Sequence, residues 1–198
     1  MTVVKEACVD NIQDAINAFK KGADRIEFCS NLKEDGLTPS NDDLIYLKKS
    51  ISIPLRVMVR PHSISFNYND DDLVQMKETI KFCKKQKFDG VVFGCLDDYN
   101  ELDLNKIKYL ADFAKPLNVI IHKAIDLTSS PVNSLKKLLE INNVNGVLSS
   151  GGCETAELGI ETLKKMINIS PNEFEIISAG KITNQNFKIL HEKIGGKF

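Results

Sequence analysis

Apolar and polar residues alternate along this chain in segments that predict strands and helices in turn. Short runs rich in Val, Ile and Phe have the length of strands that are covered on both faces, as at 88–95. Between them, apolar residues recur at the spacing of one helix face, as at 70–87. The expected strands are 3–9, 23–29, 54–60, 88–95, 117–124, 144–150 and 174–180. The expected helices run from Asn11 to Gly22 and over 42–49, 70–87, 104–115, 131–142, 154–169 and 183–193.

Residue types at the segment ends support these boundaries. Asp10 or Asn11, Ser40 and Thr183 have side-chain oxygens that can accept a hydrogen bond from the free N–H groups of a helix start. Gly22 is expected to end the first helix in a left-handed conformation.

Strands that alternate with helices predict a parallel sheet, and the number of units favours an α/β fold of the TIM-like (β/α)8 barrel type. An open doubly wound sheet is the alternative, but no G-x-G-x-x-G or G-x-x-x-x-G-K-[ST] turn occurs. Only 196–198 remain for an eighth strand. We expect one domain over 1–198, with a truncated eighth strand and no final helix. Another chain would then cover the open strand edges, which predicts a homo-oligomer.

Composition narrows the function. The net charge is −1 in 198 residues, so neither nucleic acid nor a membrane surface is an expected partner. No run approaches the roughly 18 apolar residues of a membrane span, and the N-terminus lacks the apolar core of a secretion signal. An odd number of cysteines, five, suits a reducing compartment, and we expect a cytoplasmic protein.

Charged residues and thiols stand where a plain strand would carry Val or Leu. Side chains alternate along a strand, so Glu6 shares a face with Cys8, and Arg25 shares one with Glu27 and Cys29. We expect Arg25 deep in the barrel and the other four near the carboxyl ends of the strands, where barrels hold their functional sites. Two thiolates on neighbouring strands suit Cu(I), although buried free cysteines often serve only as small apolar groups.

The arginines can serve two purposes. Arg60 ends the third expected strand, and with Arg25 it is a candidate to bind a substrate anion. Alternatively the two arginines only neutralise Glu6 and Glu27, because a buried charge is costly unless it is paired.

A further candidate, His122, ends the fifth strand. This histidine can act as a general acid or base with Glu6 or Glu27 as its carboxylate partner, or it is a structural core histidine.

More polar residues follow at the ends of the fifth and sixth strands, and they are candidates to bind a substrate. Lys123 and Asp126 lie beyond the fifth strand, and the turn S-S-G-G contains Ser149, Gly151 and Gly152. The N–H groups of such a turn can bind a phosphate or carboxylate, or the turn only joins a strand to a helix.

These residues together resemble the CutC family of copper homeostasis proteins. The resemblance is carried in order by EACVD, KGADRIEFCS, GLTPS, VMVRPH, DGVVFG, IHKAID and LSSGG. It implies a TIM-like barrel, a cytoplasmic protein and a role in copper tolerance, in which Cys8 and Cys29 match the cysteines associated with copper binding. The chain departs from the family pattern at His62, at Lys123 and in the turn SAGK, and these changes weaken an anion site.

Two functions are therefore expected. The first is a copper protein that binds Cu(I) through Cys8 and Cys29. The second is an enzyme of unassigned reaction on a small phosphate or carboxylate substrate, with Glu6, Glu27 and His122 in proton transfer. A barrel kept only for an interaction is a third reading.

Overall fold

The structure is a computed structural model that describes residues 3–197. By its internal contacts the chain forms two compact units. The N-terminal unit comprises 4–93 and 113–119, and the C-terminal unit comprises 3, 94–112 and 120–197. The described helices include none that is long and apolar enough to span a membrane.

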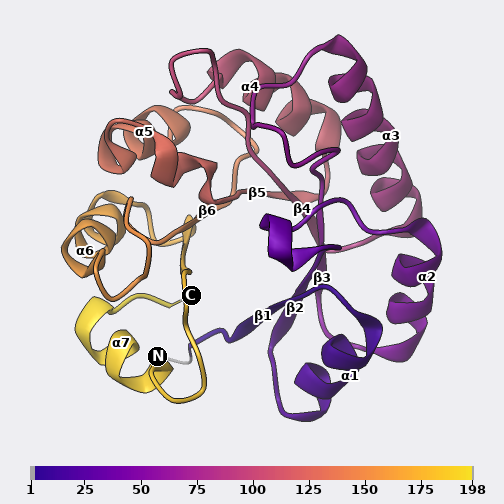
Figure 1. Ribbon diagram of the computed structural model, residues 1–198, viewed down its shortest axis with the longest axis horizontal. Helices are drawn as coiled ribbons and strands as arrows, with labels where there is room; N and C mark the ends of the chain where they lie inside the picture. The colour runs from indigo at the N-terminus through magenta and orange to yellow at the C-terminus, as the bar shows by residue number, and fades with distance from the viewer. Residues whose placement is uncertain (1–2, 198) are drawn as a thin grey trace. The chain divides into compact units, whose positions relative to one another are not determined.

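The N-terminal unit alternates parallel strands with helices that lie on their outer side (Figure 1). Its elements are β1 (Glu6–Val9), α1 (Ile12–Lys20), β2 (Arg25–Phe28), the 3-10 turn η1 (Leu32–Glu34), α2 (Asn41–Ser50), β3 (Leu55–Met58), α3 (Asp70–Gln86) and β4 (Gly90–Phe93). The register pairs Glu6 with Arg25 and Cys8 with Glu27, and Glu27 pairs onward with Arg56.

The C-terminal unit continues the same pattern. Helix α4 (Leu104–Ala114) and strand β5 (Asn118–Ile121) each have residues in both units. The remaining elements are the 3-10 turn η2 (Lys123–Leu127), α5 (Pro131–Leu138), β6 (Gly146–Ser149), α6 (Ile160–Ile169), β7 (Glu175–Ser178) and α7 (Phe187–Ile194). The strands are parallel and stand side by side in chain order from β1 to β7.

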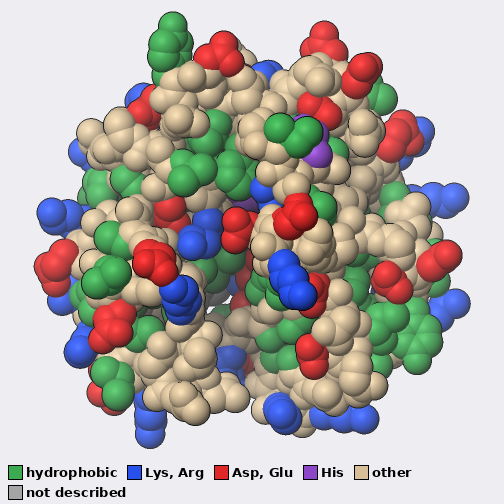
Figure 2. Space-filling model, viewed as in Figure 1, with side chains coloured by type: hydrophobic (Ala, Val, Ile, Leu, Met, Phe, Trp, Pro, Cys, Tyr) green, Lys and Arg blue, Asp and Glu red, His purple; other side chains and the backbone are tan. Residues whose placement is uncertain are grey.

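The predicted alternation and most of the predicted caps are confirmed. Asn11 and Ser40 accept hydrogen bonds from the N–H groups of Asp14 and Asp43. Gly22 follows α1 with a φ of 87°, as expected of a residue that ends a helix. Ile26, Val57 and Val91 are fully buried, whereas charged side chains lie exposed on the face that Figure 2 shows.

Two helices in the C-terminal unit begin later than the sequence predicted. Helix α6 begins at Ile160, six residues after the expected start at 154. Gly159 explains this, because a Cβ there would lie 1.9 Å from the carbonyl oxygen of Ser150, so the segment is held against the turn after β6. Thr183 does not cap α7, which begins at Phe187 after Asn186. Instead, the carbonyl of Thr183 accepts hydrogen bonds from the N–H groups of Asn186 and Phe187, which form a turn before the helix.

The residues that follow α7 carry no strand as far as 197, and the stub expected at 196–198 extends to Phe198, outside the described residues. The described part of the chain therefore has seven strands and no eighth. The expectation of a single domain stays a prediction.

Candidate functional site

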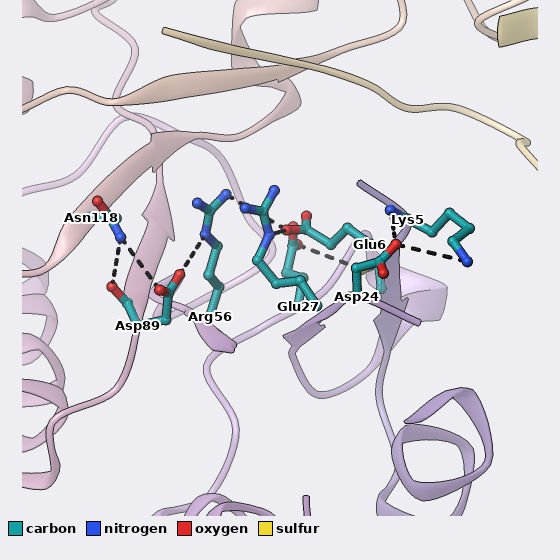
Figure 3. A network of polar contacts seen from close by, with 9 residues as sticks. Lys5, Glu6, Asp24, Glu27, Arg56, Asp89 and Asn118 are labelled. Carbon is teal, nitrogen blue, oxygen red and sulfur yellow. Dashed lines mark hydrogen bonds and ion pairs between the residues drawn. The ribbon is translucent and has the colours of Figure 1, made fainter. Parts of the chain in front are cut away.

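A buried network of ion pairs crosses the N-terminal unit (Figure 3). Glu6 Oε2 accepts from Arg25 Nε and lies 3.6 Å from Arg56 Nη1. Arg56 also contacts a second carboxylate, because its Nε donates to Asp89 Oδ2 at 3.1 Å. The side-chain amide of Asn118 donates to Asp89 as well. The side chains of Glu6, Arg25 and Arg56 are only 6%, 8% and 1% exposed. Each carboxylate therefore neutralises an arginine that would be costly to bury alone.

The network corrects the expected depth of Glu6. Glu6 is the first residue of β1 and pairs in register with Arg25, so it lies level with that arginine, away from the carboxyl end of the strand. Asp89 was missed by the sequence analysis. It directly precedes β4, whose first residue pairs with Arg56, and this register is the signal that could have found it.

One layer nearer the carboxyl ends of the strands lies a group of two thiols and a carboxyl. Cys8 Sγ donates to Glu27 Oε1 at 3.5 Å, and the Cys29 thiol is close enough to raise the pKa of Cys8. Cys29 Sγ donates to the carbonyl of Val9 at 3.6 Å. Cys29 is fully buried, whereas Cys8 keeps solvent-accessible surface although protein surrounds its thiol. The structure thus brings together the two cysteines that the sequence singled out.

The electrostatics of this group favour protonated side chains. The pKa of the Cys8 thiol is raised well above its usual value, first by the hydrogen bond with Cys29 and then by burial. Burial is also the first cause that raises the pKa of Glu27, and the neighbouring Cys8 and Glu6 add to it. Glu27 is 2% exposed, and its Oε2 has no hydrogen-bond partner among the described residues.

Alkylation should report the raised pKa of Cys8. Because the thiolate is the reactive form, iodoacetamide should modify Cys8 slowly at neutral pH, with a rate that still rises above roughly pH 9. Peptide mass spectrometry of the native protein over a pH series measures this rate, and urea-unfolded protein is the control. A native rate that levels off at or below neutral pH would contradict the prediction.

Arg60 does not join the ion network that was expected of it. Its Nη1 donates to the carbonyls of Glu34 and, at 3.0 Å, Gly36, and its guanidinium lies 4.6 Å from the ring centroid of Phe66. Arg60 is 4% exposed, and its Nε has no hydrogen-bond partner within the described part of the chain. The guanidinium therefore fastens the loop after β2, and part of its capacity to bind an anion is already used.

In the C-terminal unit the S-S-G-G turn does bind a carboxylate, and that carboxylate belongs to Asp126. Its Oδ1 accepts from Ser149 Oγ at 2.5 Å and from Gly152 N at 2.8 Å. Its Oδ2 accepts from Ser150 N at 2.8 Å and Ser150 Oγ at 2.9 Å. Gly151 adopts a φ of +74°, and its N–H donates to Ser149 Oγ. An external anion would have to displace Asp126 from these donors.

His122 caps the short η2 turn that carries Asp126. Its Nδ1 accepts from the N–H of Ala124 at 3.2 Å, which places the proton of a neutral imidazole on Nε2. His122 is 5% exposed and Lys123 is exposed. Gly94 permits the close packing, because a Cβ there would lie 2.8 Å from the His122 ring. Glu6 and Glu27 belong to the other unit, so their partnership with His122 stays a prediction.

The number and type of possible metal ligands limit which metal ion the site can bind. No group of three or more His, Cys, Asp or Glu side chains arranged for a metal ion occurs among residues 3–197. A hard cation or Zn²⁺, which takes four or more ligands, is therefore poorly matched. A pair of contacting thiols fits a soft monovalent ion, once the ion has displaced their protons.

Comparison with known proteins now decides the family. The model of the CutC family matches residues 3–197. The chain belongs to the CutC family. The human protein named copper homeostasis protein cutC homolog is 36% identical over 190 residues, which are 96% of this chain and 69% of that protein. A CutC family protein of Yersinia pseudotuberculosis is 36% identical over 182 residues, 90% of this chain and 71% of that protein.

Solved structures agree on the fold. The crystal structure described as the putative copper homeostasis protein CutC of Streptococcus agalactiae has a TM-score of 0.89 at 28% identity, and covers 99% of this chain and 96% of that one. A dihydrodipicolinate synthase of Bacillus anthracis has a TM-score of 0.64 at 15% identity, covering 100% of this chain and 69% of that one, and shows the fold alone. The predicted TIM-barrel-like fold is confirmed.

Proposed function

We propose that this CutC family member is a copper homeostasis protein that binds Cu(I) through Cys8 and Cys29. One observation carries the proposal: the register sets Cys8 opposite Glu27, so Cys29 follows on the same face near the carboxyl ends of β1 and β2, close enough to raise the pKa of Cys8. The names of the human and mouse relatives, both copper homeostasis protein cutC homologs, support it.

The chemistry of the pair fits a soft monovalent cation. Thiolate sulfur prefers Cu(I) to Mg²⁺ or Ca²⁺, and two sulfurs in contact can bind one ion. Cys8 gives access from solvent, whereas the fully buried Cys29 holds the inner position. All five cysteines are free, which supports a reducing compartment such as the cytoplasm.

Removing either sulfur should weaken Cu(I) binding by at least roughly 100-fold, because one thiolate cannot replace the pair. The measurement is competition with a chromophoric Cu(I) chelator under anaerobic conditions, for Cys8→Ser and Cys29→Ser. Cys153→Ser is the matched control, since this partly exposed cysteine lies in the other unit. Equal Cu(I) affinity of the wild type and both serine variants would rule out the pair as the ligands.

An enzyme acting on a small anion is the second candidate. The buried Glu27, whose Oε2 has no hydrogen-bond partner among the described residues, supports this function as a group for proton transfer. The proposed anion donors favour it less, because Arg60 binds two carbonyls and the turn after β6 binds Asp126. A thermal-shift screen of phosphorylated and carboxylated metabolites tests it. A stabilising ligand whose effect is lost in Arg60→Ala would support this function.

A further inference from the structure

The N-terminal unit separates acidic from basic side chains along the strand direction. Helices α1, α2 and α3 end close to the start of the next strand, through the short connections 21–24, 51–54 and 87–89. Their C-termini therefore lie at the amino ends of the strands, and their N-termini lie towards the carboxyl ends. Each helix begins with acidic residues and ends with lysines. The three helices point the same way, so their charges add.

We name as the acidic rim the carboxylates at the helix starts and in the loops after β1 and β2. They are Asp10, Asp14, Glu34, Asp35, Asp42, Asp43, Asp70 and Asp71. All but Asp10 and Asp43 are exposed. Lys33 lies among them, whereas Asp72 is excluded because it is buried and contacts His62 at 3.3 Å.

The opposite end of the unit is basic. Its lysines are Lys5, Lys20, Lys21, Lys48, Lys49, Lys84, Lys85, Lys87 and Lys115. The acids at this end are already engaged, since Asp24 pairs with Lys5 at 3.8 Å, Glu6 with Arg25, and Asp89 with Arg56 at 3.1 Å. Few carboxylates therefore remain at this end to neutralise the positive charge of the lysines.

Helix dipoles do not cancel this polarity. Each helix N-terminus carries about half a positive charge, so three helices bring about 1.5 charges to the rim. Eight carboxylates exceed this amount even after Lys33 and the buried Arg60 are subtracted. The potential at the carboxyl ends of β1 and β2 is therefore negative, and the exposed Cys8 lies one residue before the end of β1.

We propose that the acidic rim steers a soft monovalent cation to Cys8 and Cys29, so the site takes up the cation itself and repels anionic metal complexes. The inference rests on the proposed function and adds the charge class of the ligand. A second observation points the same way: Glu27 next to Cys8 is 2% exposed, and its Oε2 has no hydrogen-bond partner in the described chain. A buried carboxyl group beside the thiols offers no positive charge to pair with an anion, so the site favours a positive ligand.

The test uses silver(I) nitrate, a redox-stable soft cation, and measures the association rate by stopped-flow absorption of the silver–thiolate band. At low ionic strength, Asp70→Asn/Asp71→Asn should bind Ag(I) about three- to tenfold more slowly than the wild type. The difference should vanish in roughly 0.5 M sodium nitrate, where the charges are screened. Lys49→Gln/Lys85→Gln is the matched control, because it removes two exposed charges from the opposite end. Its rate should stay within about twofold of the wild type.

The outcomes separate this inference from the proposed function. If the wild type binds no Ag(I), the thiol site itself is refuted. If it binds Ag(I) but the aspartate variant associates as fast as the wild type at low salt, steering by the rim is refuted and the thiol site stands. If the lysine variant speeds association as much as the aspartate variant slows it, net charge governs the rate and the rim has no local role.

Discussion

Replacing Glu6 by alanine is expected to lower the free energy of unfolding by about 3–5 kcal/mol. The carboxylate of Glu6 lies between Arg25 and Arg56, and the side chains of all three are less than a tenth exposed. Its removal takes a carboxylate away from both buried guanidinium groups, whereas Asp89 still pairs with Arg56. Removing one partner from a buried ion pair costs far more than the pair contributes, because the remaining charge has lost its solvent. Urea unfolding followed by circular dichroism measures the change.

An exposed ion pair provides the matched control for Glu6. Glu78 and Lys81 pair at 3.8 Å in the same unit, with side chains about two-thirds exposed. Glu78→Ala should therefore change stability by less than about 1 kcal/mol. If Glu6→Ala costs no more than this control, the buried network does not contribute to the stability of the folded state.

Replacing Asp126 by alanine is the second large effect, with an expected loss of about 3–5 kcal/mol. Four hydrogen bonds from the turn after β6 end on this carboxylate. Ser149 is fully buried, so its hydroxyl group would lose an acceptor that water cannot easily replace, whereas Ser150 Oγ keeps the carbonyl of Cys153 as an acceptor. Asp126→Asn should be nearly as harmful, because its NH2 group would face donors. Thermal and urea unfolding measure both variants.

The control for Asp126 is another carboxylate that binds a loop. Glu101 accepts from the N–H of Ser129 at 3.1 Å, and its pKa is lowered first by a hydrogen bond with the Ser129 side chain and then by this backbone bond. Because the Glu101 carboxylate is open to water, Glu101→Gln should cost about 1 kcal/mol or less. A similar small loss in Asp126→Ala would mean that the turn keeps its shape without the carboxylate.

The buried ion network and the thiol pair occupy successive layers of the same strands. Glu6 pairs in register with Arg25, and Cys8 pairs with Glu27 two residues further along. Ion pairs between β1 and β2 therefore help to fix the register that places Cys8 beside Cys29. This predicts that variants of Glu6 that still fold bind Cu(I) less tightly, although Glu6 itself is not a proposed ligand.

Much of the thiol site was predictable from local sequence. Side-chain alternation placed Cys8 with Glu6, and Cys29 with Glu27, and the short connection from α1 made their two strands neighbours. These rules act over a few residues or between consecutive strands. They therefore hold wherever the strand assignment is right.

The partners of the loop residues were not predictable in this way. Arg60 binds carbonyls in the loop after β2, and Asp126 binds the turn after β6. Both are contacts between segments that are distant in the chain, and several partners of suitable charge were available. Which partner is reached depends on how each loop folds, and residue types alone do not specify this.

By itself, the sequence determined the alternating strands and helices, the parallel order of the strands and the face shared by the two cysteines, because periodicity and strand alternation are local properties. Only the tertiary structure decided that Glu6 lies level with Arg25, that Asp89 pairs with Arg56, and that α6 starts after Gly159. It also decided that the turn after β6 binds Asp126. The physical reason is the cost of burial, since each buried charge or N–H group must find a partner, and only the folded chain fixes which one lies within reach.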